Sequence, residues 1–169
     1  MRIIDTHTHF FTDDRTDADK NYLKKTGMML DGDDGELEGL KKFMKEDGVS
    51  VSVNAPVALS EKACLKVNRM MVEYNKRQKE VICLGTMHPS MGRAAFEEAE
   101  FLAQNRVKGV KMHPQIQNFY PDDNNMKDIY EACEKNGLYM LQHAGAGAEP
   151  DFDRAKIKGL PESFKNVIQ

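Results

Sequence analysis

The sequence predicts an α/β fold in which parallel strands alternate with amphipathic helices. Short runs rich in β-branched residues begin near Arg2, Val49, Val81, Val107 and Leu138. After the first, they recur about every 30 residues, which is close to the spacing of a (β/α)8 barrel. Strands that alternate with helices favour a parallel sheet with right-handed crossovers. We therefore expect an incomplete barrel of about five strand–helix units.

The expected strands cover residues 2–7, 49–53, 81–87, 107–113 and 138–143. Between them, apolar residues recur at helical spacing. The expected helices carry the stripes Leu37, Leu40, Phe43 and Met44; Ala63, Val67, Met70, Met71 and Tyr74; Ala95, Ala99 and Leu102; Met126, Ile129, Tyr130 and Cys133; and, after Pro161, Phe164, Val167 and Ile168. Residues 10–35 are polar and rich in aspartate, and they predict a long loop over the end of the first strand.

Composition predicts a soluble protein with one domain. The chain has 169 residues, of which 40% are hydrophobic and 8% aromatic, and its net charge is -3 with both signs interspersed. This balance favours neither a nucleic-acid nor a membrane partner, and we expect neither a membrane-spanning segment nor a signal peptide. Cys64, Cys83 and Cys133 lie far apart in predicted helices or strands, so we expect buried free thiols and a cytoplasmic location.

The first strand ends in Asp5-Thr6-His7-Thr8-His9. Strand side chains alternate, so Asp5, His7 and His9 are expected on one face, which in a closed barrel is the lumen. The carboxyl ends of barrel strands form the mouth where such enzymes work. Two imidazoles this close can ligate one metal ion, and imidazole suits Zn, Fe and Ni. The alternative is a pair of exposed histidines where the strand frays into a loop.

His143 ends the fifth expected strand and would face the same mouth. With His7 and His9 it would make a three-histidine site with one position open for water, which is the arrangement of catalytic zinc. We therefore expect a divalent metal ion, zinc in the first instance, at His7, His9 and His143. The alternative for His143 is a hydrogen-bonded core residue.

Lys111 and His113 are two residues apart at the end of the fourth expected strand, so they share a face that the pattern places inward. A lysine inside a barrel is costly unless it is paired or modified. Both residues are candidate catalytic groups. In the alternative, Lys111 pairs with a buried carboxylate such as Asp5, and His113 binds substrate or caps the strand before Pro114.

Three further residues are candidate ligands for a small-molecule substrate. His88 ends the third expected strand, and Gln115 and Tyr120 lie in the loop that follows the fourth. Each would lie at the rim of the mouth, where an imidazole, an amide and a phenol can orient a polar substrate.

Together these stretches resemble a known family. The matching motifs are Ile3-Ile4-Asp5-Thr6-His7-Thr8-His9, Gly109-Val110-Lys111-Met112-His113-Pro114, Phe119-Tyr120-Pro121-Asp122-Asp123 and His143-Ala144-Gly145. They resemble the amidohydrolase-related group, which is similar to aminocarboxymuconate-semialdehyde decarboxylase. The resemblance implies a TIM barrel, metal ligands at His7, His9 and His143, and hydrolysis of a C–N or C–O bond. Non-oxidative decarboxylation of a small carboxylate is the alternative.

Two neighbouring families begin with similar strands. The TatD-type deoxyribonucleases resemble this first motif, but they imply a glutamate ligand where this chain has Lys111. The polymerase-and-histidinol-phosphatase phosphoesterases imply later acidic and histidine motifs that are not apparent in this sequence.

The amidohydrolase resemblance also implies a histidine after the sixth strand and a metal-binding aspartate after the eighth. The sequence reaches Gln169 without a candidate for either. We therefore expect an N-terminal part of a barrel over residues 1–169, without turnover by itself: a truncated fragment or remnant, or one of two incomplete barrels that complete each other. The first and fifth strands would be open edges, which favours a homo-oligomer.

Overall fold

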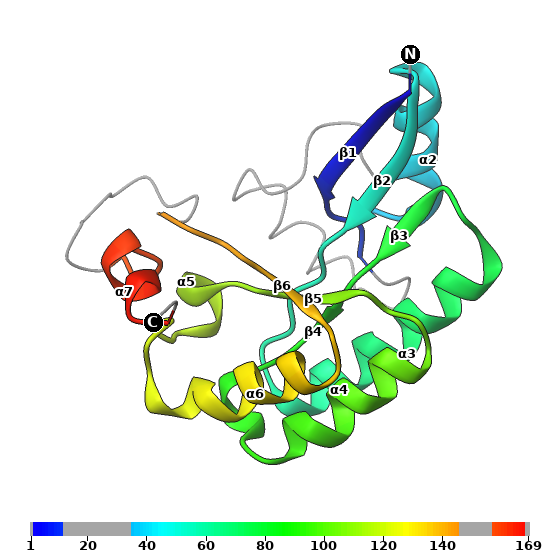
Figure 1. The fold of residues 1–169 in the computed structure, drawn as a ribbon. Helices are drawn as coiled ribbons and strands as arrows, with labels where there is room; N and C mark the ends of the chain where they lie inside the picture. Colours follow the sequence, from blue (N-terminus) through cyan, green and yellow to red (C-terminus); the bar gives the residue numbers. More distant parts are fainter. Residues whose placement is uncertain (1, 12–34, 146–156, 168–169) are drawn as a thin grey trace.

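The computed structural model describes residues 2–11, 35–145 and 157–167. The strands are β1 (Ile3–Thr8), β2 (Val49–Asn54), β3 (Val81–Cys83), β4 (Gly85–Thr86), β5 (Gly109–Met112) and β6 (Tyr139–Gln142). All paired neighbours among them are parallel and follow chain order, in two sheets, β1-β2-β3 and β4-β5-β6. The five expected runs are therefore confirmed as a curved parallel array (Figure 1).

The third expected strand is interrupted, which the sequence pattern did not predict. Leu84 separates β3 from β4, although its N–H still donates to Asn54 O at 3.0 Å and so continues the pairing with β2. At Gly85 an added Cβ would lie 2.7 Å from a methyl group of Leu102. Glycine therefore permits the close approach of the strand to the helix that covers it.

The helices are α2 (Leu37–Glu46), α3 (Glu61–Arg77), α4 (Ala94–Gln104), α6 (Lys127–Lys135) and the short α7 (Pro161–Lys165). Each overlaps an expected apolar stripe, although Met126 precedes α6, Val167 follows α7, and Ile168 lies outside the described residues. Ser60 begins α3 by accepting a hydrogen bond from Ala63 N. Helices α3, α4 and α6 lie along one side of the strands (Figure 1).

Amide side chains of α3 hold the interrupted strand in place. Asn75 and Asn68 each make a pair of hydrogen bonds to strand backbone, Asn75 to the N–H and C=O of Cys83 and Asn68 to those of Thr86. These pairs satisfy buried backbone groups at a place where the strand is too short to do so by regular sheet pairing. The interrupted run is therefore fixed to α3.

The main core lies between the strands and these helices. Val110 and Met112 of β5 are fully buried in a cluster with Ala99, Leu102 and Ile129. Since strand side chains alternate, burial of Val110 and Met112 against the helices directs Lys111, between them, to the other face. The core thus determines which residues face the lumen.

Two short elements were not predicted: η1 (Pro89–Met91) and α5 (Pro114–Gln117). A third, η2 (Asn124–Met126), is a 3-10 turn where the expected helix that carries Met126 begins. Helix α5 occupies the first part of what we expected to be an irregular loop after the fourth strand. Pro114 stands in its first turn, where its fixed φ and missing N–H are tolerated, and His113 caps it. Single helical turns leave too few residues for a period to be recognised in the sequence.

The edges of the array are open among the described residues. Strand β1 pairs with β2 and strand β6 with β5, and neither has a second described neighbour. Ile3, Ile4 and Tyr139 on these strands are 39%, 52% and 52% exposed. The expectation of open first and fifth strands is confirmed for this part of the chain.

The three cysteines are free and buried, as expected. No helix among the described residues is long and apolar enough to cross a membrane. The predicted loop at 10–35 falls for the most part on residues 12–34, outside the described ones. Its two ends meet, because Phe11 N donates to Gly35 O at 2.7 Å.

Candidate functional site

The histidines of the first strand are positioned by the residues between and beside them. Thr8 Oγ1 donates to Val53 O at 3.0 Å, and Phe10 N donates to Asn54 Oδ1 at 2.8 Å. The Phe10 ring is buried against Tyr74 of α3. With Thr8 and Phe10 anchored to β2 and α3, His7 and His9 are directed away from them, and their rings lie 5.0 Å apart.

Regular alternation does not extend over the whole motif. Asp5 pairs with Ser52, and Thr8 pairs with Asn54. Two residues on β1 therefore lie opposite a single residue on β2 between these pairs, which shifts the register by one. Such a bulge re-aims the side chains within it. Simple alternation therefore does not decide whether Asp5, His7 and His9 share one face, and that expectation stays a prediction. The Asp5 carboxylate accepts a hydrogen bond from the backbone N–H of His7 at 3.1 Å.

Lys111 faces the lumen, as expected, and its side chain is 1% exposed. Its Nζ lies 3.1 Å from His7 Nε2. No described carboxylate forms an ion pair with it, so the alternative in which Lys111 pairs with Asp5 is wrong. The Asp5 carboxylate accepts a hydrogen bond from the backbone of its own strand. The Nζ atom of Lys111 therefore meets the His7 ring and not that carboxylate.

His113 and His143 come together through the register of β5 and β6. Met112 pairs with Gln142, and His143 N donates to Met112 O at 3.1 Å, so the next residues of the two strands stand side by side. Their rings are stacked at 3.9 Å with an interplanar angle of 10°. Lys111, which pairs with Leu141 of β6, contacts the His7 ring, so His143 and His7 lie at the same end of the sheet.

His113 also caps α5, which was one of its expected alternatives. Its Nδ1 accepts a hydrogen bond from Ile116 N at 3.3 Å, and its backbone N–H donates to Gln117 Oε1 at 2.8 Å. The buried amide of Gln117 donates to Ala58 O and Met87 O, which joins the loops after three strands. Sequence reasoning missed Gln117, because a polar residue in an expected loop carries no periodic signal.

The pKa values of His7, His9 and His113 are lowered, which favours the neutral form of these three imidazoles. Desolvation, followed by the charges of His7 and Lys111, lowers the pKa of His9 to about 4. Desolvation, followed by the charges of His143 and Lys111, lowers the pKa of His113 to about 3. The pKa of His7 is also lowered, chiefly by desolvation, and burial lowers the pKa of Lys111. Neutral imidazoles have the free lone pair that metal ligation requires.

The donor types fit a divalent ion, but their arrangement in this structure is not that of a bound ion. Within residues 2–11, 35–145 and 157–167, no three His, Cys, Asp or Glu side chains are grouped so that they could hold a metal. The Nε2 atom of His7 is in contact with the Lys111 amine. The ligand set His7, His9 and His143 therefore stays a prediction.

The three candidate substrate ligands make local contacts. His88 Nδ1 accepts from Ser90 N at 3.2 Å and so caps η1. Gln115 Oε1 accepts from Lys158 N at 3.2 Å, and the Lys158 amine lies 4.3 Å from the centre of the Tyr120 ring. The structure does not bring any of the three into contact with the histidine cluster, and their roles toward substrate stay predictions.

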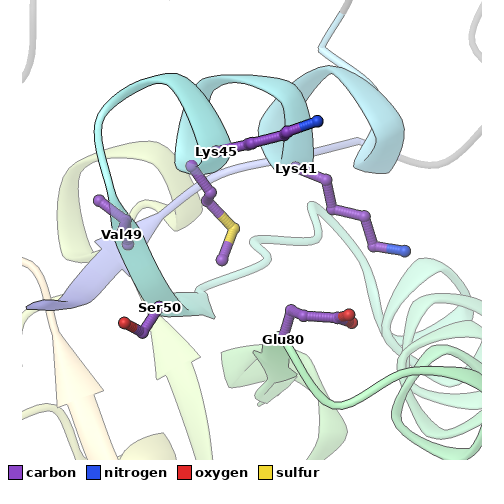
Figure 2. Close-up of a pocket in the computed structure, with 6 residues that line it drawn as sticks. Lys41, Lys45, Val49, Ser50 and Glu80 are labelled. Atoms are coloured by element: carbon purple, nitrogen blue, oxygen red, sulfur yellow. The ribbon is translucent and has the colours of Figure 1, made fainter. Parts of the chain in front are cut away.

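A separate hollow lies at the other end of β2. Figure 2 shows Lys41 and Lys45 of α2 above Val49, Ser50 and Glu80, and Met44 also lines the hollow. Val49 is the first residue of β2, whereas His7 is the last residue but one of β1, and His9, His113 and His143 come directly after the last residues of β1, β5 and β6. The amino-terminal face of such barrels contributes to stability and does not carry the chemistry.

The family model for amidohydrolases matches residues 4–167. The chain belongs to the amidohydrolase family. A comparison with curated proteins finds no match, whereas solved structures of similar fold are found.

Three of these structures show what the fold resembles. A 5-carboxyvanillate decarboxylase from Sphingomonas paucimobilis is 22% identical with a TM-score of 0.66, over 91% of this chain and 55% of that one. A 5-carboxyvanillate decarboxylase from Novosphingobium aromaticivorans, with bound manganese and a nitrobenzoic acid, is 15% identical with a TM-score of 0.62. The match covers 85% of this chain and 51% of that one. An uncharacterised TIM-barrel protein from Bordetella bronchiseptica is 17% identical with a TM-score of 0.59, over 89% and 58%.

The fold of this amidohydrolase-family chain is thus α/β, with parallel strands that form part of a TIM barrel, as expected. The chain spans about half the length of the solved structures it matches. At these identities the likeness concerns the fold, and function has to be argued from the site.

Proposed function

We propose that this amidohydrolase-family chain carries the metal-binding part of a hydrolase that cleaves a C–N or C–O bond of a small molecule. One divalent ion, zinc in the first instance, would be held by His7, His9 and His143. The observation that carries the proposal is the gathering of His7, His9, Lys111, His113 and His143 at the carboxyl ends of β1, β5 and β6. When bound, the ion would supply Lewis-acid polarisation of the scissile group and activation of a water molecule.

The side chains of this chain would bind and orient the reactants. The neutral ring of His113 stacks on His143 and limits its rotation, while the cap on α5 fixes the His113 ring itself. The Asp5 carboxylate holds the backbone at His7. The buried amine of Lys111 lies beside these rings and supplies positive charge to an anionic group of the substrate.

Non-oxidative decarboxylation of a small carboxylate is the second candidate. It is favoured by the charge of the site, because the buried Lys111 has no described anionic partner and a substrate carboxylate would provide one. Two of the similar structures are 5-carboxyvanillate decarboxylases, one of which holds manganese. Manganese is therefore the second metal to test.

The experiment measures metal binding first and turnover second. The purified chain is stripped of metal and titrated with Zn²⁺ and Mn²⁺, in parallel with His7→Ala and His143→Ala. His88→Ala serves as the matched control, because this histidine caps η1 and makes no described contact with the cluster. We expect one ion per chain, weakened by at least about tenfold in the first two variants and unchanged in the control.

Turnover is then assayed on small amides, lactones and aromatic carboxylates. Hydrolysis supports the first candidate, and release of CO₂ supports the second. One bound ion without turnover indicates the inactive fragment considered above. Equal metal binding by the protein and by its His7→Ala and His143→Ala variants contradicts the proposed site.

A further inference from the structure

The side chain of Gln117 in α5 is buried and uses both N–H donors and the carbonyl acceptor of its amide. Its Oε1 accepts from the backbone N–H of His113 at 2.8 Å, and its Nε2 donates to Ala58 O at 2.8 Å and to Met87 O at 2.7 Å. A primary amide has two N–H donors and one carbonyl oxygen, which match two backbone carbonyl groups and one backbone N–H. The reversed amide would turn its oxygen toward both carbonyl groups, so these partners determine its orientation.

Gln117 connects three loops at the carboxyl end of the array. Ala58 lies in the loop after β2, Met87 comes directly after β4, and His113 comes directly after β5. Strand β2 belongs to one sheet, whereas β4 and β5 belong to the other. The amide therefore joins the ends of the two sheets on the side where the histidines lie. Because a buried carbonyl group without a partner is costly, these bonds hold the three loops in one arrangement.

The backbone of His113 is bound on both sides by the same residue. Its N–H donates to the Gln117 side chain, and its carbonyl oxygen accepts from Gln117 N at 2.9 Å. The His113 ring accepts from Ile116 N at 3.3 Å and stacks on His143 at 3.9 Å, with an interplanar angle of 10°. A displacement of the Gln117 amide would therefore displace the backbone from which the stacked ring extends.

We propose that Gln117 is a positioning residue, whose amide places the His113 ring against His143 and keeps the loops after β2, β4 and β5 in one arrangement around the mouth. Gln117 acts through His113 and does not itself meet a reactant. A ring stacked at 3.9 Å restricts the rotation of the His143 imidazole. Functional groups have to be held within about 0.5 Å of their working geometry, which requires supporting hydrogen bonds of this kind. The consequence for function rests on the proposed role of His143 as a metal ligand.

Two variants separate a positioning role from a general loss of stability. Gln117→Met keeps the length of the side chain and removes the three hydrogen bonds of its amide. Asn75→Leu is the matched control, because the Asn75 amide also makes two bonds to strand backbone, at Cys83, but makes no described contact with His113 or His143.

Nuclear Overhauser effects between the ring protons of His113 and His143 report the stacked contact directly. We expect these effects in the unaltered protein and in Asn75→Leu, and we expect their loss in Gln117→Met. Their persistence in Gln117→Met, or an equal loss in both variants, would overturn the proposal.

A second measurement needs no variant that might fail to fold. Hydrogen exchange of the side-chain amide of Gln117 is compared with that of Gln104, which is exposed and donates to the exposed Glu100 carboxylate. Because the Gln117 amide donates to two buried residues, its exchange should be slower by at least about tenfold. Exchange as fast as that of Gln104 would show that the amide is not held between the loops, and the proposal would be wrong.

Titration with Zn²⁺ separates this inference from the proposed function. If His143→Ala weakens Zn²⁺ binding, Gln117→Met should weaken it by at least about tenfold, as the loss of a supporting hydrogen bond does at metal sites, and Asn75→Leu should leave it unchanged. Unchanged binding in Gln117→Met beside a loss in His143→Ala would refute the positioning role. If His143→Ala binds Zn²⁺ as well as the unaltered protein, the proposed metal site fails, whereas the contact between the two rings still decides whether Gln117 places them.

Discussion

Replacement of Asn68 by alanine should destabilise the fold and loosen the site at once. The Asn68 side chain is fully buried and makes three hydrogen bonds, to Thr86 N, Thr86 O and Glu98 Oε1, at 2.8, 2.9 and 2.8 Å. Each bond contributes about 1 kcal/mol net, and each buried group left without a partner costs about 1–3 kcal/mol. Glu98 keeps two bonds from Arg69, so the loss falls on the backbone of Thr86. We expect a loss of about 3–4 kcal/mol in the free energy of unfolding.

Urea denaturation followed by circular dichroism measures this loss. Asn105→Ala is the matched control, because Asn105 follows α4 and its side chain donates a single bond to Phe101 O of that helix. The control should lose about 1 kcal/mol or less. A loss in Asn68→Ala no larger than in Asn105→Ala would refute the reasoning that α3 holds the interrupted strand through buried amides.

The remaining predictions concern pH and assembly. Because the pKa values of His9 and His113 are lowered to about 4 and about 3, the folded state binds fewer protons than the unfolded state, whose histidines titrate near pH 6.5. The stability they contribute is present above about pH 6.5 and is lost as the pH falls toward those values, by up to about 1.4 kcal/mol per pH unit for each histidine. Urea midpoints at pH 7 and 5 check this, and equal midpoints would contradict it. If the open β1 edge pairs with a second copy of the chain, sedimentation should show an oligomer that grows with protein concentration. Ile4→Lys, on this edge, should weaken the oligomer. Leu59→Lys, which changes an exposed loop residue, should not. Identical sedimentation of Ile4→Lys and the unaltered chain would argue against this edge.

The sequence predicts the strands and main helices because each is long enough to show its period. The burial of Val110 and Met112, with Lys111 facing the other way, follows from simple alternation. Alternation fails where the backbone departs from regular geometry. The bulge between Asp5 and Thr8 and the break at Leu84 depend on packing against β2 and α4, which no local pattern reports.

The residues that make up the candidate site could be predicted from the sequence, but the contacts between their side chains could not. Strand ends in a parallel array meet at one edge, so His7, Lys111 and His143 could be placed together from their positions alone. The side chain that contacts Lys111 could not be predicted from these positions. It depends on where the bulge directs the His7 ring and on Asp5 accepting a bond from its own strand. The amides of Asn68 and Gln117 were missed, because buried polar side chains that form hydrogen bonds with the backbone follow no periodic pattern in the sequence.

The central claim is that His7, His9 and His143 hold one divalent ion. X-ray absorption at the zinc edge of the metal-loaded chain tests it most directly, since imidazole ligands give a characteristic multiple-scattering pattern. The account predicts three imidazoles with Zn–N distances of about 2.0–2.1 Å, and one imidazole fewer in His143→Ala. A spectrum with oxygen ligands alone, or one that is the same in the protein and in His143→Ala, would contradict it.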